Sequence, residues 1–93
     1  MHSLDTLFLD RDGVINVKLE ERYVRNSNEF EFMQGALVAI SKLSKLFKRI
    51  LIVTNQQGIG KGIMTEDDLN LLHSFMTSEI GKLNGKIDKI YFC

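Results

Sequence analysis

Residues 7–16 read LFLDRDGVIN, and this stretch decides the fold. Residues 6–9 form a short run without polar alternation, which is typical of a strand buried on both faces of a parallel sheet. The run ends abruptly at Asp10-Arg11-Asp12-Gly13, where glycine permits a sharp turn. The stretch therefore predicts a buried strand that delivers two acidic side chains to one edge of a sheet.

Two helical patterns and two further apolar runs follow. A helix is predicted over 35–47, because apolar side chains recur there at three- and four-residue steps, at Leu37, Ile40, Leu43 and Phe47. A second apolar strand is predicted over 50–53. A second helix begins at Thr65, a hydroxyl cap followed by three acidic residues, and is broken at Asn84-Gly85.

A third strand is predicted over 87–92, and residues 17–34 read as an irregular insert. The order is strand, insert, helix, strand, helix, strand. This order is typical of an α/β fold with parallel strands joined by right-handed crossovers. The polar loops after the first two strands would then share the carboxyl edge of the sheet, where open α/β folds bind ligands.

The two aspartates suit phosphoryl transfer. Asp10 could attack phosphorus and form an aspartyl-phosphate, while Asp12 donates a proton to the leaving oxygen and later takes one from water. A divalent cation would offset the repulsion between the anionic nucleophile and an anionic substrate, and hard oxygen ligands favour Mg²⁺. A solvated turn is the alternative, since Asp and Gly are common turn residues. A Ca²⁺-binding loop is excluded because its sixth position, which requires glycine, is Ile15.

The second loop reads TNQQGIGKG, residues 54–62. Thr54 is expected beside Asp10, where its hydroxyl can donate to a phosphoryl oxygen. The following amides, with Asn55, Gln56 and Lys61, would complete an anion cradle. The spacing of glycines matches neither the Walker loop nor the dinucleotide fingerprint. Taken alone the loop could be a flexible turn, but two apolar strands ending in DxDG and TN favour a phosphate site.

Composition narrows the class of protein. The chain has 93 residues, enough for one domain, with twelve basic and twelve acidic residues. A balanced charge argues against broad nucleic-acid binding. The single cysteine, Cys93, excludes an intrachain disulfide and favours a reducing compartment. We see no signal peptide or membrane span, so we expect a cytoplasmic protein.

A few other side chains have two interpretations. His73 falls at the margin of the apolar stripe of the second helix, which favours a partly buried structural histidine over a ligand. Tyr23, Phe30 and Phe32 could close over a substrate or belong to an ordinary packed loop. Lys61 could contact a distal phosphate or remain solvated.

With both loops in view, the chain resembles the haloacid dehalogenase (HAD) superfamily of phosphohydrolases over nearly its whole length. LFLDRDGVIN, the segment ERYV at 21–24, and VTNQQGIGKG at 53–62 resemble its D,D-heptose 1,7-bisphosphate and histidinol-phosphatase branch. Asn16 and the VTNQQGIGKG loop favour the heptose side of this branch. Polynucleotide 3′-phosphatases have a similar loop and stay open. The resemblance implies a Rossmann-like fold with three α/β/α layers and a small sugar-phosphate substrate, D-glycero-D-manno-heptose 1,7-bisphosphate before the alternatives.

The resemblance also assigns roles. Asp10 matches the nucleophile and Asp12 the general acid/base, while Thr54 matches the phosphate-binding hydroxyl. Asn55 and Gln56 match positions that line the phosphate pocket. Asp10 and the backbone carbonyl of Asp12 would ligate Mg²⁺. We add further residues to the predicted substrate-binding set: Arg11, Gly13, Asn16 and Lys61.

The chain departs from the family pattern at its end, IYFC. Cys93 matches the first cysteine of a zinc loop, but one thiolate cannot make a structural zinc site, so we do not expect this chain alone to hold Zn²⁺. The family's catalytic Lys and last metal-binding acid would follow that loop. We therefore expect residues 1–93 to be the N-terminal part of one domain. A catalytically silent phosphate-binding fragment is the second hypothesis, and an unpaired edge of the first strand predicts self-association.

Overall fold

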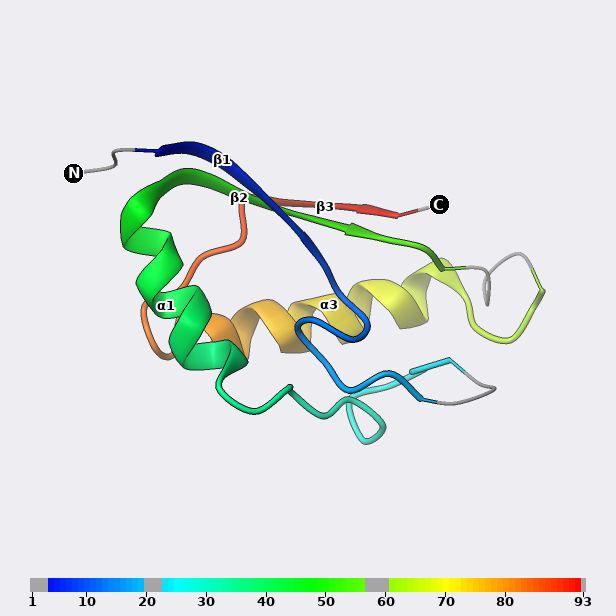
Figure 1. Ribbon diagram of the computed structural model, residues 1–93. Helices are drawn as coiled ribbons and strands as arrows, with labels where there is room; N and C mark the ends of the chain where they lie inside the picture. Colours follow the sequence, from blue (N-terminus) through cyan, green and yellow to red (C-terminus); the bar gives the residue numbers. More distant parts are fainter. Residues whose placement is uncertain (1–3, 20–22, 57–60, 93) are drawn as a thin grey trace.

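The computed structural model describes residues 4–19, 23–56 and 61–92, and within them it has an α/β architecture (Figure 1). The elements follow in the predicted order: β1 (Leu4–Asp10), α1 (Ala36–Leu46), β2 (Phe47–Thr54), α3 (Glu66–Gly81) and β3 (Lys89–Phe92). None of the helices in these ranges is long and apolar enough to cross a membrane.

The three strands form one parallel sheet in the order β1-β2-β3. Asp10 pairs with Val53, and Thr54 pairs with Phe92. The carboxyl ends of β1 and β2 therefore lie side by side, as predicted, and the loops that follow them meet at one edge of the sheet. In the described residues β1 has a neighbour on one side only, which is β2.

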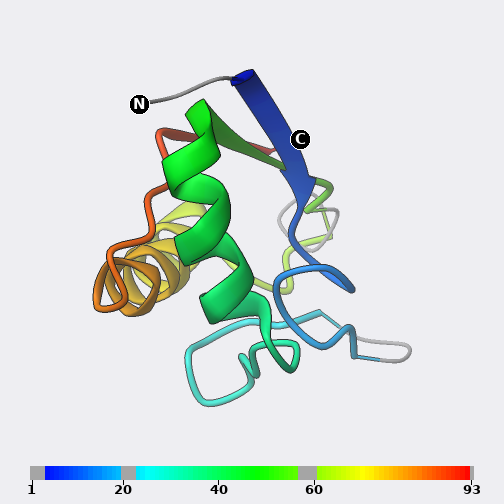
Figure 2. The same cartoon turned by 60° about the vertical axis from the view of Figure 1, so that its left-hand side comes forward.

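Both helices cover the same face of the sheet (Figures 1 and 2). This follows because both crossovers step in the same direction along the sheet, and right-handed crossovers of that kind place their helices on one side. Ile50 and Ile52 of β2 are fully buried beneath the helices. Two of the three expected layers are thus present among the described residues.

The opposite face of the sheet is open. Phe8 is 61% exposed, and its neighbours on this face, Val53 and Tyr91, are exposed as well. The prediction that residues 6–9 are buried on both faces is therefore wrong for Phe8. The apolar run correctly indicated a parallel strand, but in the described residues no helix packs on this face.

The ends of the helices follow from local chemistry. Thr65 and Asp68 form a reciprocal capping box at the start of α3, with both hydrogen bonds 3.0 Å long. After α3 the chain turns at Gly85, where a Cβ would lie 2.7 Å from Ile80 Cγ2. The predicted first helix ran one residue too far, because Phe47 has extended backbone angles and begins β2.

The insert between β1 and α1 is a packed loop. Val24 and Phe30 are buried in the main core. The Phe30 ring lies 4.9 Å from that of Phe32 and 6.1 Å from that of Phe75 in α3, in edge-to-face arrangements. The insert thus packs against α3 through these aromatic rings. For Phe30, the packed-loop interpretation is confirmed.

Candidate active site

The turn after β1 is tightly bonded. Gly13 adopts φ 87°, a left-handed conformation that glycine tolerates best. The Arg11 carbonyl accepts N–H groups from Val14, Ile15 and Asn16, and the Gly13 N–H donates to the Asn16 carbonyl at 2.7 Å. This compact turn brings Asp12 back beside the end of the strand that Asp10 terminates.

A cavity of about 710 Å³ opens at this edge of the sheet. It receives both aspartates from the first loop and Thr54 from the second, as the parallel pairing of the strands requires. Its lining consists of Asp10, Arg11, Asp12, Lys18, Leu19, Tyr23, Val24, Val53, Thr54, Asn55, Lys61 and Ile63. The carboxylates, a hydroxyl and two lysines thus surround one space large enough for a small phosphate ester.

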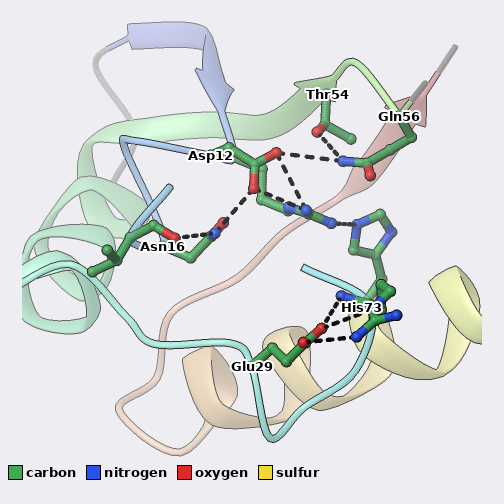
Figure 3. Close-up of polar contacts among 9 residues, drawn as sticks. Asp12, Asn16, Glu29, Thr54, Gln56 and His73 are labelled. Carbon is green, nitrogen blue, oxygen red and sulfur yellow. Dashed lines mark hydrogen bonds and ion pairs between the residues drawn. The ribbon is translucent and has the colours of Figure 1, made fainter. Parts of the chain in front are cut away.

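The Asp12 carboxylate is held on several sides (Figure 3). Arg11 Nη2 donates to its two oxygens at 2.9 and 3.2 Å, and Asn16 Nδ2 donates to Oδ1 at 3.0 Å. Burial alone would raise the pKa of Asp12. The hydrogen bonds from Asn16 and Arg11, with the charge of Arg11, outweigh burial and hold that pKa below its ordinary value. Asp12 is therefore a fixed, ionised carboxylate at neutral pH.

Gln56 lies behind Thr54 and against Arg11. One terminal atom of its amide lies 2.6 Å from the Thr54 hydroxyl and 3.1 and 3.3 Å from the two terminal nitrogens of Arg11. An amide nitrogen there would face donors only, so we assign the oxygen to this position. The 3.5 Å contact with Asp12 Oδ2 drawn in Figure 3 is then not a hydrogen bond. Gln56 accepts from both loops and links them.

Arg11 itself is buried, with 1% of its surface exposed. Its Nη1 lies 3.0 Å from Nε2 of His73, a residue of α3 that is also buried. Its guanidinium carbon lies 6.0 Å from the centre of the Phe30 ring. Burial and the charge of Arg11 lower the pKa of His73 to about 4, while Asp12 opposes this shift, so the ring is neutral at physiological pH.

Comparison with known proteins gives this geometry a context. Over 87 residues the chain is 41% identical to the D-glycero-alpha-D-manno-heptose-1,7-bisphosphate 7-phosphatase of Mycobacterium tuberculosis, covering 94% of this chain and 46% of that protein. The crystal structure of D,D-heptose 1,7-bisphosphate phosphatase from B. bronchiseptica, complexed with magnesium and phosphate, superposes with a TM-score of 0.90 at 30% identity. That match covers 97% of this chain and 50% of the other.

A Mesorhizobium loti protein described as a HAD-like phosphatase also superposes, with a TM-score of 0.78 at 25% identity over 100% of this chain and 44% of the other. The chain is related to the HAD-like phosphatases. Its likeness is to the heptose bisphosphate branch, as the motifs predicted. No protein-family model matches the chain. The chain spans about half the length of the HAD-like relatives that it matches.

The predicted residues of this HAD-like site separate into two groups. One group lines the cavity: Asp10, Arg11, Asp12, Thr54, Asn55 and Lys61. Tyr23 also lines it, with Lys61 Nζ 5.8 Å from the centre of its ring, which agrees with an interpretation left open for Tyr23. Lys18 was not predicted, since an exposed lysine in an irregular insert carries no signal.

The other group supports the cavity from behind. Gly13 shapes the turn, and Asn16 and Gln56 are buried, with hydrogen bonds to Asp12 and Arg11 respectively. In the described residues they do not line the cavity, so their predicted contact with substrate stays a prediction. Cys93 lies outside the described residues. His73 was predicted to be structural and is buried, but its contact with Arg11 was missed, because only its place beside an apolar stripe hinted at it.

The residues present fit a magnesium ion of the kind that HAD-like phosphatases imply. Asp10 and Asp12 offer hard oxygen donors at one end of the cavity. No group of three or more His, Cys, Asp or Glu among the described residues could form a metal cage. Mg²⁺ commonly takes only one or two protein carboxylates, with water and substrate phosphate oxygens as its other ligands. The Asp10 carboxylate and the backbone carbonyl of Asp12, beside a phosphate-sized space, meet that requirement.

Proposed function

We propose that this chain carries the nucleophile and phosphate-binding half of a magnesium-dependent phosphatase site. The observation that carries the proposal is that Asp10, Asp12 and Thr54, from two neighbouring strand ends, line one cavity. The substrate we propose is a small sugar phosphate, D-glycero-D-manno-heptose 1,7-bisphosphate, because proteins named as heptose 1,7-bisphosphate phosphatases match 94% and 97% of this chain, at 41% and 30% identity. The single cysteine supports a reducing, cytoplasmic setting.

In the first step the Asp10 carboxylate attacks phosphorus, and the bond between phosphorus and the sugar oxygen breaks. Asp12 donates a proton to the leaving sugar oxygen. In the second step Asp12 takes a proton from a water molecule as that water attacks the aspartyl-phosphate. Inorganic phosphate leaves, and the Asp10 carboxylate is restored. When the substrate binds, the Thr54 hydroxyl would turn its one hydrogen from the Gln56 amide oxygen to the phosphoryl group and donate to it in both steps.

The low pKa of Asp12 bears on these two roles. An ionised Asp12 suits the second step, in which it acts as a base. For the first step it must be protonated, and a bound phosphate dianion would favour this because its negative charge raises the pKa of a neighbouring carboxyl. We expect binding of the phosphate ester to raise the pKa of Asp12 enough for its carboxyl group to become protonated.

Asp10, through its carboxylate, and Asp12, through its backbone carbonyl, would hold Mg²⁺. When bound, the ion neutralises the charge of the phosphoryl group and reduces its repulsion of the attacking carboxylate. The residues of this chain then orient the two reacting groups: the turn at Gly13 fixes Asp12, and the end of β1 places Asp10.

A second candidate is a phosphate-binding part that does not turn over. It is favoured by the length of the relatives, which is about twice that of this chain. It is also favoured by the described lining of the cavity, in which Asp10 and Asp12 are the acidic residues and no third acid is present to help bind the metal. We propose that residues 1–93 are the N-terminal portion of one domain. A lysine and a further acid from the remaining portion would complete the site, as the family resemblance implies.

Phosphate release distinguishes the candidates. The chain is incubated with heptose 1,7-bisphosphate, with and without Mg²⁺, and the acid-stable phosphoenzyme fraction and free phosphate are measured. Histidinol phosphate and an oligonucleotide 3′-phosphate are compared as substrates. Magnesium-dependent release that is lost in Asp10→Asn supports the phosphatase. Magnesium-dependent phosphate binding without release supports the second candidate, and release that survives Asp10→Asn refutes the nucleophile assignment.

A further inference from the structure

Arg11 is the centre of a buried polar cluster that joins three separate parts of the chain. Its Nη2 donates to both oxygens of Asp12, at 2.9 and 3.2 Å. Its Nη1 lies 3.0 Å from His73 Nε2, sixty-two residues away on α3. The Gln56 amide oxygen accepts from both nitrogens, at 3.1 and 3.3 Å.

The contact between Arg11 and His73 has only one chemical form. A guanidinium has donors and no acceptor, so the histidine nitrogen that faces it must be the acceptor. Nε2 is therefore unprotonated, the ring is neutral, and its proton is on Nδ1. A protonated His73 would place two cations 3.0 Å apart in a buried site.

His73 does more than pack in the core, because it helps to set the orientation of the Arg11 guanidinium. Arg11 Nε has no hydrogen-bond partner in the described part of the chain, so the two terminal nitrogens set the orientation of the planar group. One terminal nitrogen is held by α3 and the other holds Asp12. A turn of the guanidinium plane would disturb both contacts at once.

We propose that His73 is a positioning residue for proton transfer: through Nε2 it holds the Arg11 guanidinium, which holds the Asp12 carboxylate at the wall of the cavity. The catalytic role of this relay rests on the proposed function, in which Asp12 transfers protons. The hydrogen-bonded relay itself, from α3 through Arg11 to the turn after β1, exists whether or not the chain turns over.

The first test reads the relay directly, by NMR on the full chain. In the wild type, long-range ¹H–¹⁵N spectra should show His73 Nε2 as an unprotonated nitrogen and Nδ1 as a protonated one. The Arg11 terminal N–H groups should give separate signals, because each is held. The opposite tautomer of His73, or freely rotating terminal nitrogens of Arg11, overturns the proposal without any variant being made.

Variants separate positioning from packing. His73→Leu keeps a buried side chain but removes the acceptor, and should merge the Arg11 signals. His73→Gln offers an amide oxygen near the former Nε2 and should restore them. Leu72→Val, one residue away and equally buried, is the matched control for loosened packing and should leave them separate. Separate Arg11 signals in a folded His73→Leu, or merged signals in Leu72→Val, contradict the relay.

If the chain turns over, kcat gives a second readout. His73→Leu should lower kcat by about 10²-fold with KM little changed, as expected when a reacting group is displaced. His73→Gln should recover most of this loss. Equal loss in Leu72→Val and His73→Leu would show a structural effect only and overturn the catalytic role. A wild type without turnover refutes the proposed function of the chain alone, and the NMR result then still decides the relay.

Discussion

The end of β1 and the turn that follows it differ sharply, although their two aspartates are only two residues apart. At the strand end Asp10 is exposed, and in the described residues its carboxylate makes no hydrogen bond or ion pair. In the turn Asp12 is partly buried and accepts three hydrogen bonds of 2.9 to 3.2 Å from Arg11 and Asn16. One carboxylate is free and the other is fixed.

This difference matches what the two proposed steps require. A nucleophile has to approach phosphorus, and strong hydrogen bonds would tie up the electron pairs with which it attacks. A general acid and base acts over hydrogen-bond distance and has to be oriented before the reaction. The comparison therefore predicts that substitutions at the strand end affect chemistry alone, whereas substitutions in the turn affect chemistry and folding together.

Asp10→Asn should have the largest effect on activity and almost none on stability. Without the carboxylate no aspartyl-phosphate forms, so phosphate release should fall to background. The free energy of unfolding should change by less than about 0.5 kcal/mol, since the side chain is exposed and makes no contact that the substitution removes. Phosphate release and urea unfolding measure the two quantities. A large loss of stability would show that Asp10 is not free in the folded chain.

Arg11→Met should be the most destabilising change in the turn. It leaves Asp12 without its cation, and breaking a buried pair on one side costs roughly 3–5 kcal/mol. We expect the lower end, about 3 kcal/mol, because the Asp12 side chain is 27% exposed. Urea unfolding at pH 7 measures it.

The control for this variant is Arg49→Met. Arg49 pairs with Asp5 at the same 2.9 Å, but both side chains are more than half exposed. Exposed pairs contribute about 0–1 kcal/mol, so this variant should remain close to the wild type. Equal losses in the two variants would mean that burial of the Arg11 pair has no energetic consequence and that the turn is no more sensitive to substitution than the surface.

The grouping of residues at the end of β1 could largely be predicted from sequence, because it depends on residues that are close together in the chain. An apolar run that stops at DxDG, a second that stops at TN, and the rule that parallel strands align their carboxyl ends suffice to bring Asp10, Asp12 and Thr54 together. The cap of α3 is local as well, since Thr65 and Asp68 are three residues apart. These features need no knowledge of distant side chains.

The supporting cluster could not be predicted in this way. Arg11 and His73 meet only because the fold brings the turn after β1 against α3, and neither residue type signals the other from sixty-two positions away. Asn16 and Gln56 were predicted to contact substrate because they stand in the right motifs, yet both are buried with their amides turned toward the cluster. A motif locates a residue in the chain, whereas packing decides which way its side chain faces.

His73 should make stability depend on pH between 5 and 7. Its pKa is lowered from 6.5 to about 4 by folding, so between these values the unfolded chain binds a proton that the folded chain does not. Stability therefore rises with pH across this window and the contribution is complete above about 6.5. From pH 5 to 7 the gain is about 2 kcal/mol.

His73→Gln provides the comparison, because it removes the titrating group and keeps an acceptor for Arg11. Urea unfolding at several pH values should show a flatter profile for this variant than for the wild type. The pKa of Asp12 is lowered, so its carboxyl titrates below this window and affects both proteins alike. Superimposable profiles would contradict a neutral, buried His73.

Substitutions on the open face of β1 should have the smallest effect on stability and the clearest effect on self-association. Phe8 lies on β1, whose outer edge has no partner strand in the described residues, and the residue is 61% exposed. We propose that this edge and face promote self-association, since an unpaired apolar strand pairs readily with another chain.

Phe8→Lys should change the free energy of unfolding by less than about 1 kcal/mol and shift the chain toward the monomer in light scattering. The matched control is Leu71→Lys, which adds the same charge on α3, outside the sheet, at a leucine that is 72% exposed. If Leu71→Lys reduces association as much as Phe8→Lys, general solubility and not the strand edge is the cause. A wild type that stays monomeric at high concentration would refute the predicted self-association.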